Sequence, residues 1–514
     1  MKESNKITFK KRDGQNLSSW QVGIPGIVNP VLSKISETIY DCLIIGGGIT
    51  GLTAALLLQN TGKNVMVAEA NAVGFGTTGG TSDHINNFAD TTYKEAERAF
   101  GKEGASLFAK AIIEGQDIIK GNIDNYKIDC DYEPKSAIVY AEDDEQVDQL
   151  TLLFAGLAMV GIPARFIDEI PVEIPFKKAI NIENQAQFHP LKYLQGLQRA
   201  FLAAGGNLLE NTRIYKVNTS DEIHIAESSQ MTIRAKNIIY ATHMPPNINV
   251  MNLEKAPYRS YVLAVKFKND SYPDDLIYDL GEPYHYFRSH TVDGEKLLLA
   301  GGKDHKTGHE DSDKQMGELE KYIRKYFDVS SIKYKWSSLY YIPVDGLPYI
   351  GQLPLAAKGI YCATGFNGNG MMLGSVAAKI LSELVISGTS IYKDLFDPCR
   401  VKPVDSFKEF VSENAEVAYH LVADRFGIHE TDILTRIEPG TGKLVEVDGK
   451  KVAAYRDEKG KVYALKPTCT HMGCIVNWNP EEKSWDCPCH GARFAIDGKV
   501  LTGPATINLL EITE

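Results

Sequence analysis

Apolar and polar positions alternate in a way that predicts a strand, a helix and a second strand early in the chain. Residues 40–45 are a short apolar run suited to a buried parallel strand. Residues 52–59 then follow helical spacing, and residues 64–68 form a second apolar run. This order predicts a βαβ unit. Residues 6–36 before it show no clear period and predict an irregular arm.

The middle of the chain continues as mixed α/β structure. Residues 191–204 and 371–385 have the apolar spacing of amphipathic helices. Short apolar runs predict strands at 208–210, 212–217, 236–242, 261–267, 284–288, 296–300 and 360–363. The stretches between 261 and 300 favour an antiparallel sheet beside the βαβ unit.

The last part of the chain changes character. Residues 397–403 contain two prolines, which cannot continue a helix and therefore predict a boundary. A polar connector follows over residues 407–426. Short strands are then predicted at 443–447, 451–455 and 462–465, with Asp448-Gly449 as a hairpin signal. The chain therefore ends in a small β-domain.

Composition limits the class of protein. A length of 514 residues predicts about three domains, and 43% hydrophobic with 24% charged residues is typical of a globular protein. The net charge of −11 argues against nucleic acid as a partner. We expect no transmembrane segment and a cytoplasmic protein, because the sequence has no long apolar window and no apolar signal near its start. Four scattered cysteines are predicted to be buried thiols: Cys42, Cys130, Cys362 and Cys399.

The turn after the first strand carries a dinucleotide-binding pattern. Gly46 allows a tight turn, Gly48 lets the backbone approach a pyrophosphate at the helix N-terminus, and Gly51 permits close packing of helix on strand. Glu69 ends the second strand about 20 residues later, where a carboxylate binds ribose hydroxyls. The pattern predicts a dinucleotide but leaves FAD and NAD open; chance glycines in a turn are the alternative.

Three further motifs resemble the FAD-dependent family of glycine, sarcosine and D-amino-acid oxidoreductases. They are a small-residue loop at 74–82 that contains Thr77 and Thr78, residues 345–351, and the glycine-rich stretch 359–371 with Gly365, Gly368, Gly370 and Met371. The resemblance covers residues 40–395 and implies FAD. The helix after Gly370 would present its positive end to the flavin. A tight turn with no ligand is the alternative.

The tail contains two Cys-His pairs, Cys469-x-His471 and Cys487-x-x-His490, each with one further cysteine, Cys474 or Cys489. Two thiolates and two neutral imidazoles can hold a [2Fe–2S] cluster. A Cys2His2 zinc site uses the same ligand types and stays open as an alternative.

The tail resembles the Rieske family, which implies a [2Fe–2S] cluster on these four ligands and a disulfide between Cys474 and Cys489. High-potential relatives carry Ser and Tyr hydroxyls near the cluster sulfurs, where this chain has Ala492 and Phe494. The loss of two donors predicts a lower reduction potential. Residues 503–505 match the proline loop that covers the cluster in that family.

Candidate substrate residues lie on the predicted antiparallel sheet. Arg288 is the first candidate, because a guanidinium pairs with a substrate carboxylate, although an Arg in a surface ion pair is at least as good an alternative. Tyr258 and Tyr286 are further candidates, with sheet-core packing as the alternative. Two histidines, His305 and His309, are interpreted as solvated loop residues. His84 is interpreted as a polar loop histidine rather than a site of covalent FAD attachment, and we expect noncovalent FAD.

The predicted fold class is α/β plus β: a Rossmann-like FAD-binding domain with an antiparallel-sheet substrate domain, followed by a small all-β Rieske domain. The expected segments are an arm (1–39), the flavin part (40–395; FAD at 40–90, 190–250 and 340–395, substrate at 91–189 and 251–339), a linker (396–425) and the Rieske domain (426–514).

The predicted function is a dehydrogenase that oxidises an amino acid or secondary amine. Electrons would pass from FAD through the cluster to an external acceptor, either a protein or a quinone-linked carrier. Three alternatives remain: reverse flow, in which the cluster feeds FAD for a reduction or oxygenation; a redox-responsive module without enzyme activity; and a zinc-stabilised tail on an ordinary flavoenzyme.

Overall fold

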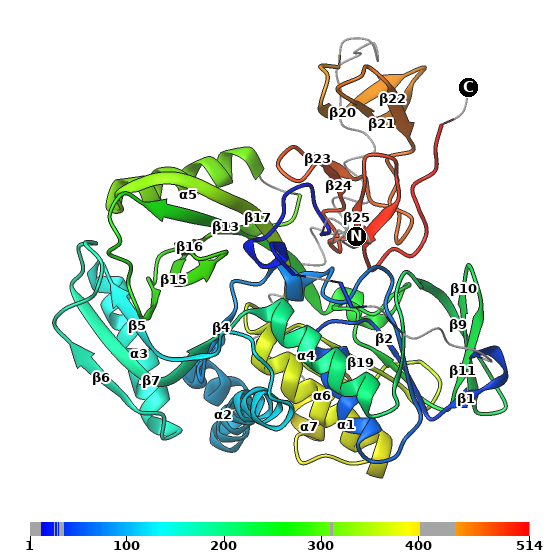
Figure 1. The fold of residues 1–514 in the computed structure, drawn as a ribbon, viewed down its shortest axis with the longest axis horizontal. Helices are drawn as coiled ribbons and strands as arrows, with labels where there is room; N and C mark the ends of the chain where they lie inside the picture. The colour runs from blue at the N-terminus through cyan, green and yellow to red at the C-terminus, as the bar shows by residue number, and fades with distance from the viewer. Residues whose placement is uncertain are drawn as a thin grey trace, which may run out of the picture.

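The structure is a computed structural model, and it describes residues 12–24, 26–27, 29, 35–308, 312–400 and 437–512. The predicted connector at 407–426, most of the predicted linker and His309 lie outside the described residues. Figure 1 shows one large body built on two sheets, with the C-terminal domain standing on top of it.

A six-stranded sheet forms around the predicted βαβ unit. Its strands are parallel except at the β18–β19 edge. In spatial order they are β18 (Tyr349–Gln352), β19 (Ile360–Thr364), β12 (Ile238–Tyr240), β2 (Cys42–Ile45), β3 (Val65–Ala68) and β8 (Asn207–Leu209). Most of these strand residues are buried, which explains their continuous apolar runs.

Helices that pack by this sheet include α1 (Ile49–Gln59), α4 (Pro190–Ala203) and α6 (Gly370–Ser387). Among the described helices, α6 alone is long and apolar enough to span a membrane. Its side chains are largely buried, and it packs against α1 and against α2 (Tyr93–Tyr126), so it is a core helix. A short α7 (Lys393–Phe396) follows.

A nine-stranded, mainly antiparallel sheet forms the second layer. The path runs β17 (Val329–Pro343), β13 (Lys255–Phe267), β16 (Glu295–Lys306), β15 (His285–Val292), β14 (Leu276–Tyr278), β5 (Glu133–Ala141), β7 (Lys178–Gln187) and β4 (His84–Ile85), with β6 (Ala164–Ile167) beside β7. Helix α3 (Asp144–Met159) packs near β5, and α5 (Ser312–Tyr326) covers β13 and β16. The predicted antiparallel sheet is confirmed, with longer strands than expected.

A smaller four-stranded sheet lies at the end of the body opposite the β5–β7 sheet edge (Figure 1). It consists of β1 (Ile39–Tyr40), β11 (Thr232–Ala235), β10 (Ile223–Ser228) and β9 (Ile214–Ser220). Short 3₁₀ turns complete the body: η1 (Ser19–Gln21), η2 (Ile35–Glu37), η3 (Thr77–Gly80) and η4 (Val250–Leu253).

The C-terminal domain, described over residues 437–512, is all β, as predicted. One sheet contains β20 (Thr441–Val447), β21 (Lys450–Arg456) and β22 (Val462–Leu465), and a second contains β23 (Asn477–Asn479), β24 (Ser484–Asp486), β25 (Arg493–Phe494) and β26 (Val500–Thr502). Figure 1 places the second sheet against the body and the first sheet outside it. The cysteine-rich loops therefore lie on the side of the domain that faces the body.

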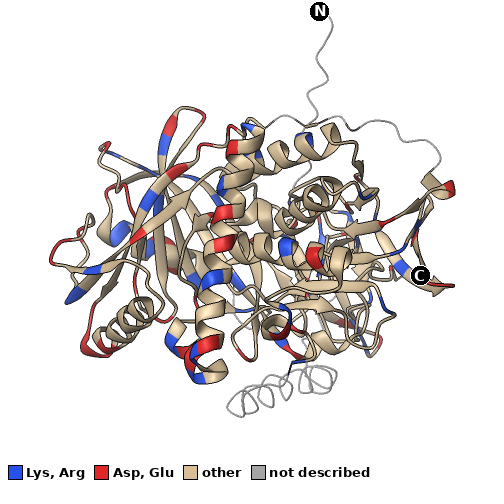
Figure 2. Ribbon diagram, turned by 90° about the horizontal axis from the view of Figure 1, so that it is seen from below, with Lys and Arg blue, Asp and Glu red and all other residues tan. Residues whose placement is uncertain are grey.

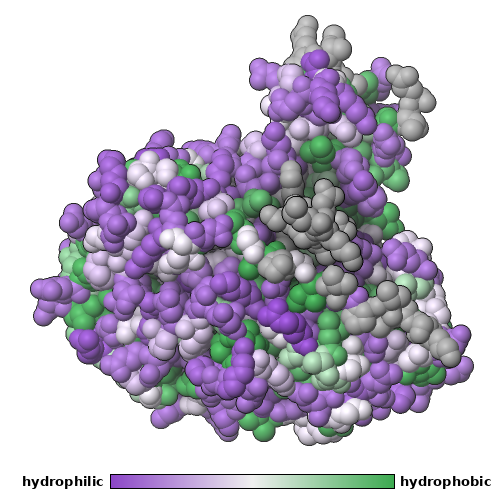
Figure 3. Space-filling view, in the orientation of Figure 1, coloured by the Kyte–Doolittle hydropathy of each residue, from purple (hydrophilic) through white to green (hydrophobic). Residues whose placement is uncertain are grey.

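The surface is polar and mixed in charge. Figure 3 shows mainly hydrophilic residues on the visible face, and in Figure 2 Lys and Arg are interspersed with Asp and Glu.

Three of the four scattered cysteines are buried as predicted. The prediction is wrong for Cys399, which is exposed because it follows α7 in the turn that leaves the body.

Candidate active site

A cavity of about 310 Å³ is lined by residues of both large sheets. One end contains the glycine turn between β2 and α1 together with Glu69, at the end of β3. The other end contains tyrosines of the nine-stranded sheet. A long cavity of this kind can hold a dinucleotide at one end and a small molecule at the other.

The glycine turn has the geometry of a dinucleotide-binding turn. A Cβ atom on Gly46, which has a φ of +114°, would lie 2.4 Å from the carbonyl oxygen of Ala241, and one on Gly51 would lie 1.9 Å from that of Gly46. Gly48 caps α1 without a side-chain hydrogen bond. The N–H of Ile49 donates to the Thr78 hydroxyl, whereas those of Thr50 and Gly51 precede the first intrahelical bond and can bind an anionic group in the cavity.

Glu69 lies at the nucleotide end, as predicted. Its carboxylate accepts hydrogen bonds from the N–H groups of Gly47, at 2.7 Å, and Asn71, at 2.8 Å. Burial raises the pKa of Glu69, and these bonds and the charge of Arg213 oppose the shift. Glu69 is thus a hydrogen-bonding group in the cavity wall.

Two of the three further FAD motifs, the loop at 74–82 and the glycine-rich stretch 359–371, meet at the same cavity. Thr77, Thr78, Gly368, Gly370 and Met371 line it, and the Thr78 hydroxyl accepts from the N–H of Ile49 at 3.3 Å.

Asn369 caps α6 without a side-chain bond, and a Cβ on Gly370 would meet no atom within 4 Å. Two predicted glycines, Gly51 and Gly365, lie behind the lining. Two uncapped helix ends and an acid around one long cavity fit FAD.

The substrate end is polar and aromatic. Tyr286, a candidate substrate contact, lines the cavity, and its hydroxyl lies 3.0 Å from that of Ser260. The Asp304 carboxylate accepts from the Tyr340 hydroxyl at 2.8 Å, and burial raises the pKa of Asp304 to about 7. Sequence reasoning missed Asp304 because it belongs to a polar stretch without a motif.

His84 belongs to the cavity wall and not to a polar loop. It lies on the short strand β4, where its Nδ1 is 2.9 Å from the Tyr278 hydroxyl and its Nε2 is buried without a hydrogen-bond partner. Burial and the charge of Arg288 lower the pKa of His84 well below its usual value, so the ring is neutral. The interpretation of His84 as a polar loop residue is therefore wrong. Noncovalent FAD stays a prediction.

Arg288 does not line the cavity. Its side chain is fully buried, its Nη1 donates to the carbonyl oxygen of Asp83 at 2.5 Å, and it lies 3.6 Å from the Asp83 carboxylate. The guanidinium also lies over the ring of Trp20, 5.3 Å from its centre. This position gives no support to a carboxylate contact, and the alternative of a surface ion pair is also wrong, because Arg288 pairs with Asp83 in the interior.

Two other residues also lie away from the predicted places. Tyr258 packs on the ring of Tyr340, with centres 5.9 Å apart, and is not part of the cavity lining. The partly buried His305 on β16 stacks on Tyr261 at 5.5 Å, so the interpretation of His305 as a solvated loop residue is wrong.

The four predicted cluster ligands are brought together by two loops of the C-terminal domain. The rings of His471 and His490 lie 4.9 Å apart at 85°, and the side chains of Cys469 and Cys487 are hydrogen-bonded to each other. The Nδ1 atoms of both histidines are buried without a hydrogen-bond partner. Two thiols and two free Nδ1 atoms at one place fit a [2Fe–2S] cluster.

The disulfide between Cys474 and Cys489 is confirmed. These two sulfurs lie near Cys487, but their bond removes them as metal ligands. Ala492 and Phe494 are fully buried near the ligands. Neither side chain offers a hydroxyl group, which is the basis of the predicted lower potential.

The ligand loops touch the body directly. The Tyr341 hydroxyl donates to the carbonyl oxygen of His490 at 3.0 Å, and Nε2 of His471 lies 3.1 Å from the carbonyl oxygen of Asn247. The predicted proline loop, residues 503–505, lies within residues 501–506, all of which line the long cavity. The two candidate cofactor sites therefore share a wall.

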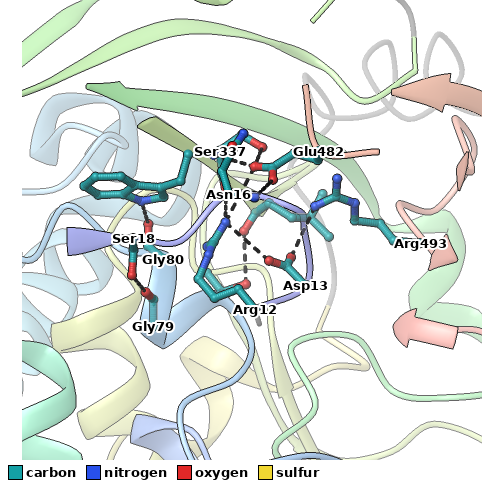
Figure 4. Close-up of polar contacts among 12 residues, drawn as sticks. Arg12, Asp13, Asn16, Ser18, Gly79, Gly80, Ser337, Glu482 and Arg493 are labelled. Carbon is teal, nitrogen blue, oxygen red and sulfur yellow. Dashed lines mark hydrogen bonds and ion pairs between the residues drawn. The ribbon is translucent and has the colours of Figure 1, made fainter. Parts of the chain in front are cut away.

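The N-terminal arm, described over residues 12–24, joins the two parts (Figure 4). Nη2 of Arg12 donates to the carbonyl oxygen of Ser337 on β17 at 2.6 Å and lies 3.6 Å from Glu482, and Asp13 lies 3.5 Å from Arg493. Farther along the arm, the Ser18 hydroxyl donates to the carbonyl oxygen of Gly79 in η3 at 2.7 Å. The arm is irregular, as predicted, but it is buried between both parts.

Arg12, Asp13, Glu482 and Arg493 belong to a buried charge network, completed by Asp486 and Arg259. It contains three arginines and three carboxylates. Sequence reasoning missed this network, because its members come from three distant segments, residues 12–13, residue 259 and residues 482–493.

Comparison with known proteins agrees with the geometry. Residues 41–384 match the family described as FAD dependent oxidoreductase, and residues 431–512 match the Rieske [2Fe-2S] domain. A Rieske 2Fe-2S iron-sulfur protein of Bacillus subtilis (strain 168), YhfW, is 35% identical over 94% of this chain and 95% of its own length. Gamma-glutamylputrescine oxidoreductase of Escherichia coli (strain K12) is 23% identical over 67% of this chain and 83% of its own.

Among solved structures, glycine oxidase from Geobacillus kaustophilus has a TM-score of 0.59 at 17% identity and covers 70% of this chain and 99% of its own. L-amino acid deaminase from Proteus vulgaris has a TM-score of 0.60 at 15% identity and covers 73% of this chain and 97% of its own. These likenesses show the fold.

The fold and the two sites define a flavoprotein with an iron–sulfur domain. The chain belongs to the FAD-dependent oxidoreductase family, carries a C-terminal Rieske domain, and binds FAD and a [2Fe–2S] cluster. The Rieske match replaces the zinc alternative for the tail.

Proposed function

We propose that this protein is a dehydrogenase that oxidises a C–N bond of an amine or amino acid and delivers the electrons through its Rieske domain to an external acceptor. The observation that carries the proposal is the shared wall. Residues 501–506, beside the cluster ligands, line the same cavity as Gly46 and Tyr286. When bound, FAD supplies a two-electron hydride acceptor and the cluster supplies a one-electron carrier.

Contacts within the shared wall support electron transfer from FAD to the cluster. Contacts from Tyr341 to His490 and from Asn247 to His471 hold the ligand loops against the cavity. The arm fixes both η3, which lines the cavity, and the C-terminal domain. A short and fixed path between the centres favours a dehydrogenase over an oxygen-consuming oxidase.

The names of the relatives support a C–N substrate. One relative is an oxidoreductase of gamma-glutamylputrescine, and the structural neighbours include a glycine oxidase and an L-amino acid deaminase. A substrate-sized end of the cavity, lined by Tyr286, Ser260 and Asp304, argues against a module without enzyme activity. The cytoplasm remains the expected compartment, since three of the free thiols, Cys42, Cys130 and Cys362, are buried and unpaired.

An anaerobic titration of the purified holoprotein with amines and amino acids tests the proposal. Flavin absorbance and the electron-spin resonance of the cluster are followed together. We expect one compound to bleach the flavin and a reduced Rieske signal to follow. If dithionite reduces both centres but no amine or amino acid does, the substrate class or the direction of flow is wrong.

A further inference from the structure

The substrate end of the cavity is acidic. Among the described residues that line the cavity, the carboxylates are Glu69, Asp90 and Asp304, and the cationic side chain is Arg213. Arg213 belongs to the nucleotide end, where its charge acts on Glu69. Asp90 and Asp304 belong to the tyrosine end, which is therefore left with two acids and no lysine or arginine in its described lining.

The two acids are held by neutral groups. Asp90 accepts from the N–H of Gly368 at 2.8 Å, and Asp304 accepts from the Tyr340 hydroxyl while its Oδ1 is buried without a hydrogen-bond partner. The charge of Asp90 contributes to the raised pKa of Asp304, so the two carboxylates lie close enough to repel each other. No cation among the described residues contributes to either shift.

The arginines of the neighbouring sheet are engaged elsewhere. Arg288 is paired with Asp83 and covered by Trp20, while Arg259 lies 3.7 Å from Asp486 in the charge network of the arm. Both guanidinium groups are buried outside the cavity. A substrate carboxylate would therefore meet Asp90 and Asp304 with no cation in the described lining to pair with it.

Tyrosine rings complete the wall. Tyr278, Tyr284, Tyr286 and Tyr340 line this end, and the rings of Tyr284 and Tyr286 lie 5.8 Å apart. An aromatic wall attracts an organic ammonium group through its ring faces. This end therefore combines aromatic rings with two acids that have no cationic partner, and its described lining contains no lysine or arginine. These features fit a positively charged ligand.

We propose that the substrate end selects a cationic amine without a carboxylate next to its nitrogen, and that Asp304 is a specificity-determining residue that pairs with the ammonium group. This inference rests on the proposed function and narrows its substrate class from amines and amino acids to amines. Asp90 adds to the negative potential of the site without replacing Asp304, because its carboxylate is already bonded to the Gly368 N–H.

Two ligands of matched shape and opposite charge test the selectivity without turnover. Oxidised holoprotein is titrated anaerobically at pH 8 with benzylamine and, separately, with benzoate, and the shift in flavin absorbance gives each Kd. We expect benzylamine to bind at least about tenfold more tightly, because its ammonium group gains a charge-assisted contact that the benzoate carboxylate lacks. Tighter binding of benzoate overturns the proposal, and this comparison needs no variant.

The Asp304→Asn substitution tests whether Asp304 causes the preference for the cationic ligand. In Asp304→Asn, we expect the Kd of benzylamine to rise about tenfold or more while that of benzoate stays the same or falls. The matched control is Asp274→Asn, whose carboxylate is exposed and paired with Lys135 outside the cavity. Equal benzylamine affinity in Asp304→Asn and in the control would remove Asp304 from this role.

Failure of this inference can be separated from failure of the proposed function. Chemical reduction of FAD in the same samples, followed by the cluster signal, tests electron transfer between the centres without any amine. If electrons reach the cluster but benzoate binds more tightly than benzylamine, the proposed function stands and the inference of a cationic substrate is wrong.

Discussion

Two aspartates in this protein, Asp486 and Asp304, have opposite pKa shifts, and the contrast separates structural from ligand-binding charge. Asp486 lies in the interface between arm and Rieske domain, where burial raises its pKa but the charges of Arg493 and Arg259 outweigh burial and lower it. Asp304 lies in the cavity, where burial raises its pKa to about 7 and no cation among the described residues opposes the shift. A carboxylate with cationic partners, such as Asp486, stabilises the contact between the arm and the Rieske domain. A carboxylate without one, such as Asp304, can bind a cationic ligand.

Removing one cation from the network has the largest expected effect. Arg493→Met leaves Asp486 and Asp13 buried with one partner fewer, and breaking a buried pair in this way costs about 3–5 kcal/mol. Denaturant unfolding of the holoprotein measures the loss. The control Lys499→Met removes an exposed ion pair with Asp497, for which we expect a change near zero. A similar loss in both variants would contradict the role of the network.

The two aspartates should respond to neutralisation with opposite signs. Asp486→Asn removes a carboxylate whose lowered pKa stabilises the fold above its unfolded value of 3.8, so the melting temperature falls by a similar amount at pH 8 and pH 5, and the difference shrinks only as the pH falls below about 4. Asp304→Asn removes a group whose ionisation is unfavourable in the fold, so the melting temperature rises, and more at pH 8 than at pH 5. Calorimetry of both variants at three pH values measures this. Melting temperatures that shift in the same direction in both variants would contradict the distinction between the two aspartates.

Cation binding should depend on pH in the way that Asp304 ionises. With a pKa of about 7, the carboxyl group is mostly neutral at pH 6 and ionised at pH 8. Benzylamine stays protonated throughout this range, so its affinity should fall about tenfold per pH unit below the pKa. The measurement is the flavin absorbance titration repeated from pH 5.5 to 8.5. Affinity that does not change with pH, or that rises as the pH falls, would contradict this account.

Sequence patterns predicted the parts of the molecule that depend on local chemistry. The glycine turn at Gly46 and the ligand pairs of the Rieske domain are short motifs, because a tight turn or a metal loop needs particular residues at fixed spacing. Five strands of the six-stranded sheet were predicted from continuous apolar runs, since both faces of those strands are buried, whereas β18 was not predicted as a strand.

Features that depend on distant segments were not predictable in the same way. Arg12 and Asp13 look like an ordinary charged terminus, and only their contacts with Glu482 and Arg493 explain their burial. Arg288 follows aromatic residues on a strand, a position equally compatible with the cavity or with Asp83. The elements between residues 91 and 189 were not predicted, and four glycines within α2 obscure the helical pattern there.

The central claim is that the two centres exchange electrons within one fixed unit, and concentration dependence tests it most directly. FAD in the anaerobic holoprotein is reduced by a light pulse with a photochemical donor, and growth of the reduced Rieske signal is timed at two protein concentrations a factor of about ten apart. The account predicts the same rate at both, because the shared wall at residues 501–506 makes the transfer intramolecular. A rate proportional to protein concentration, or no Rieske signal after FAD is reduced, would contradict it.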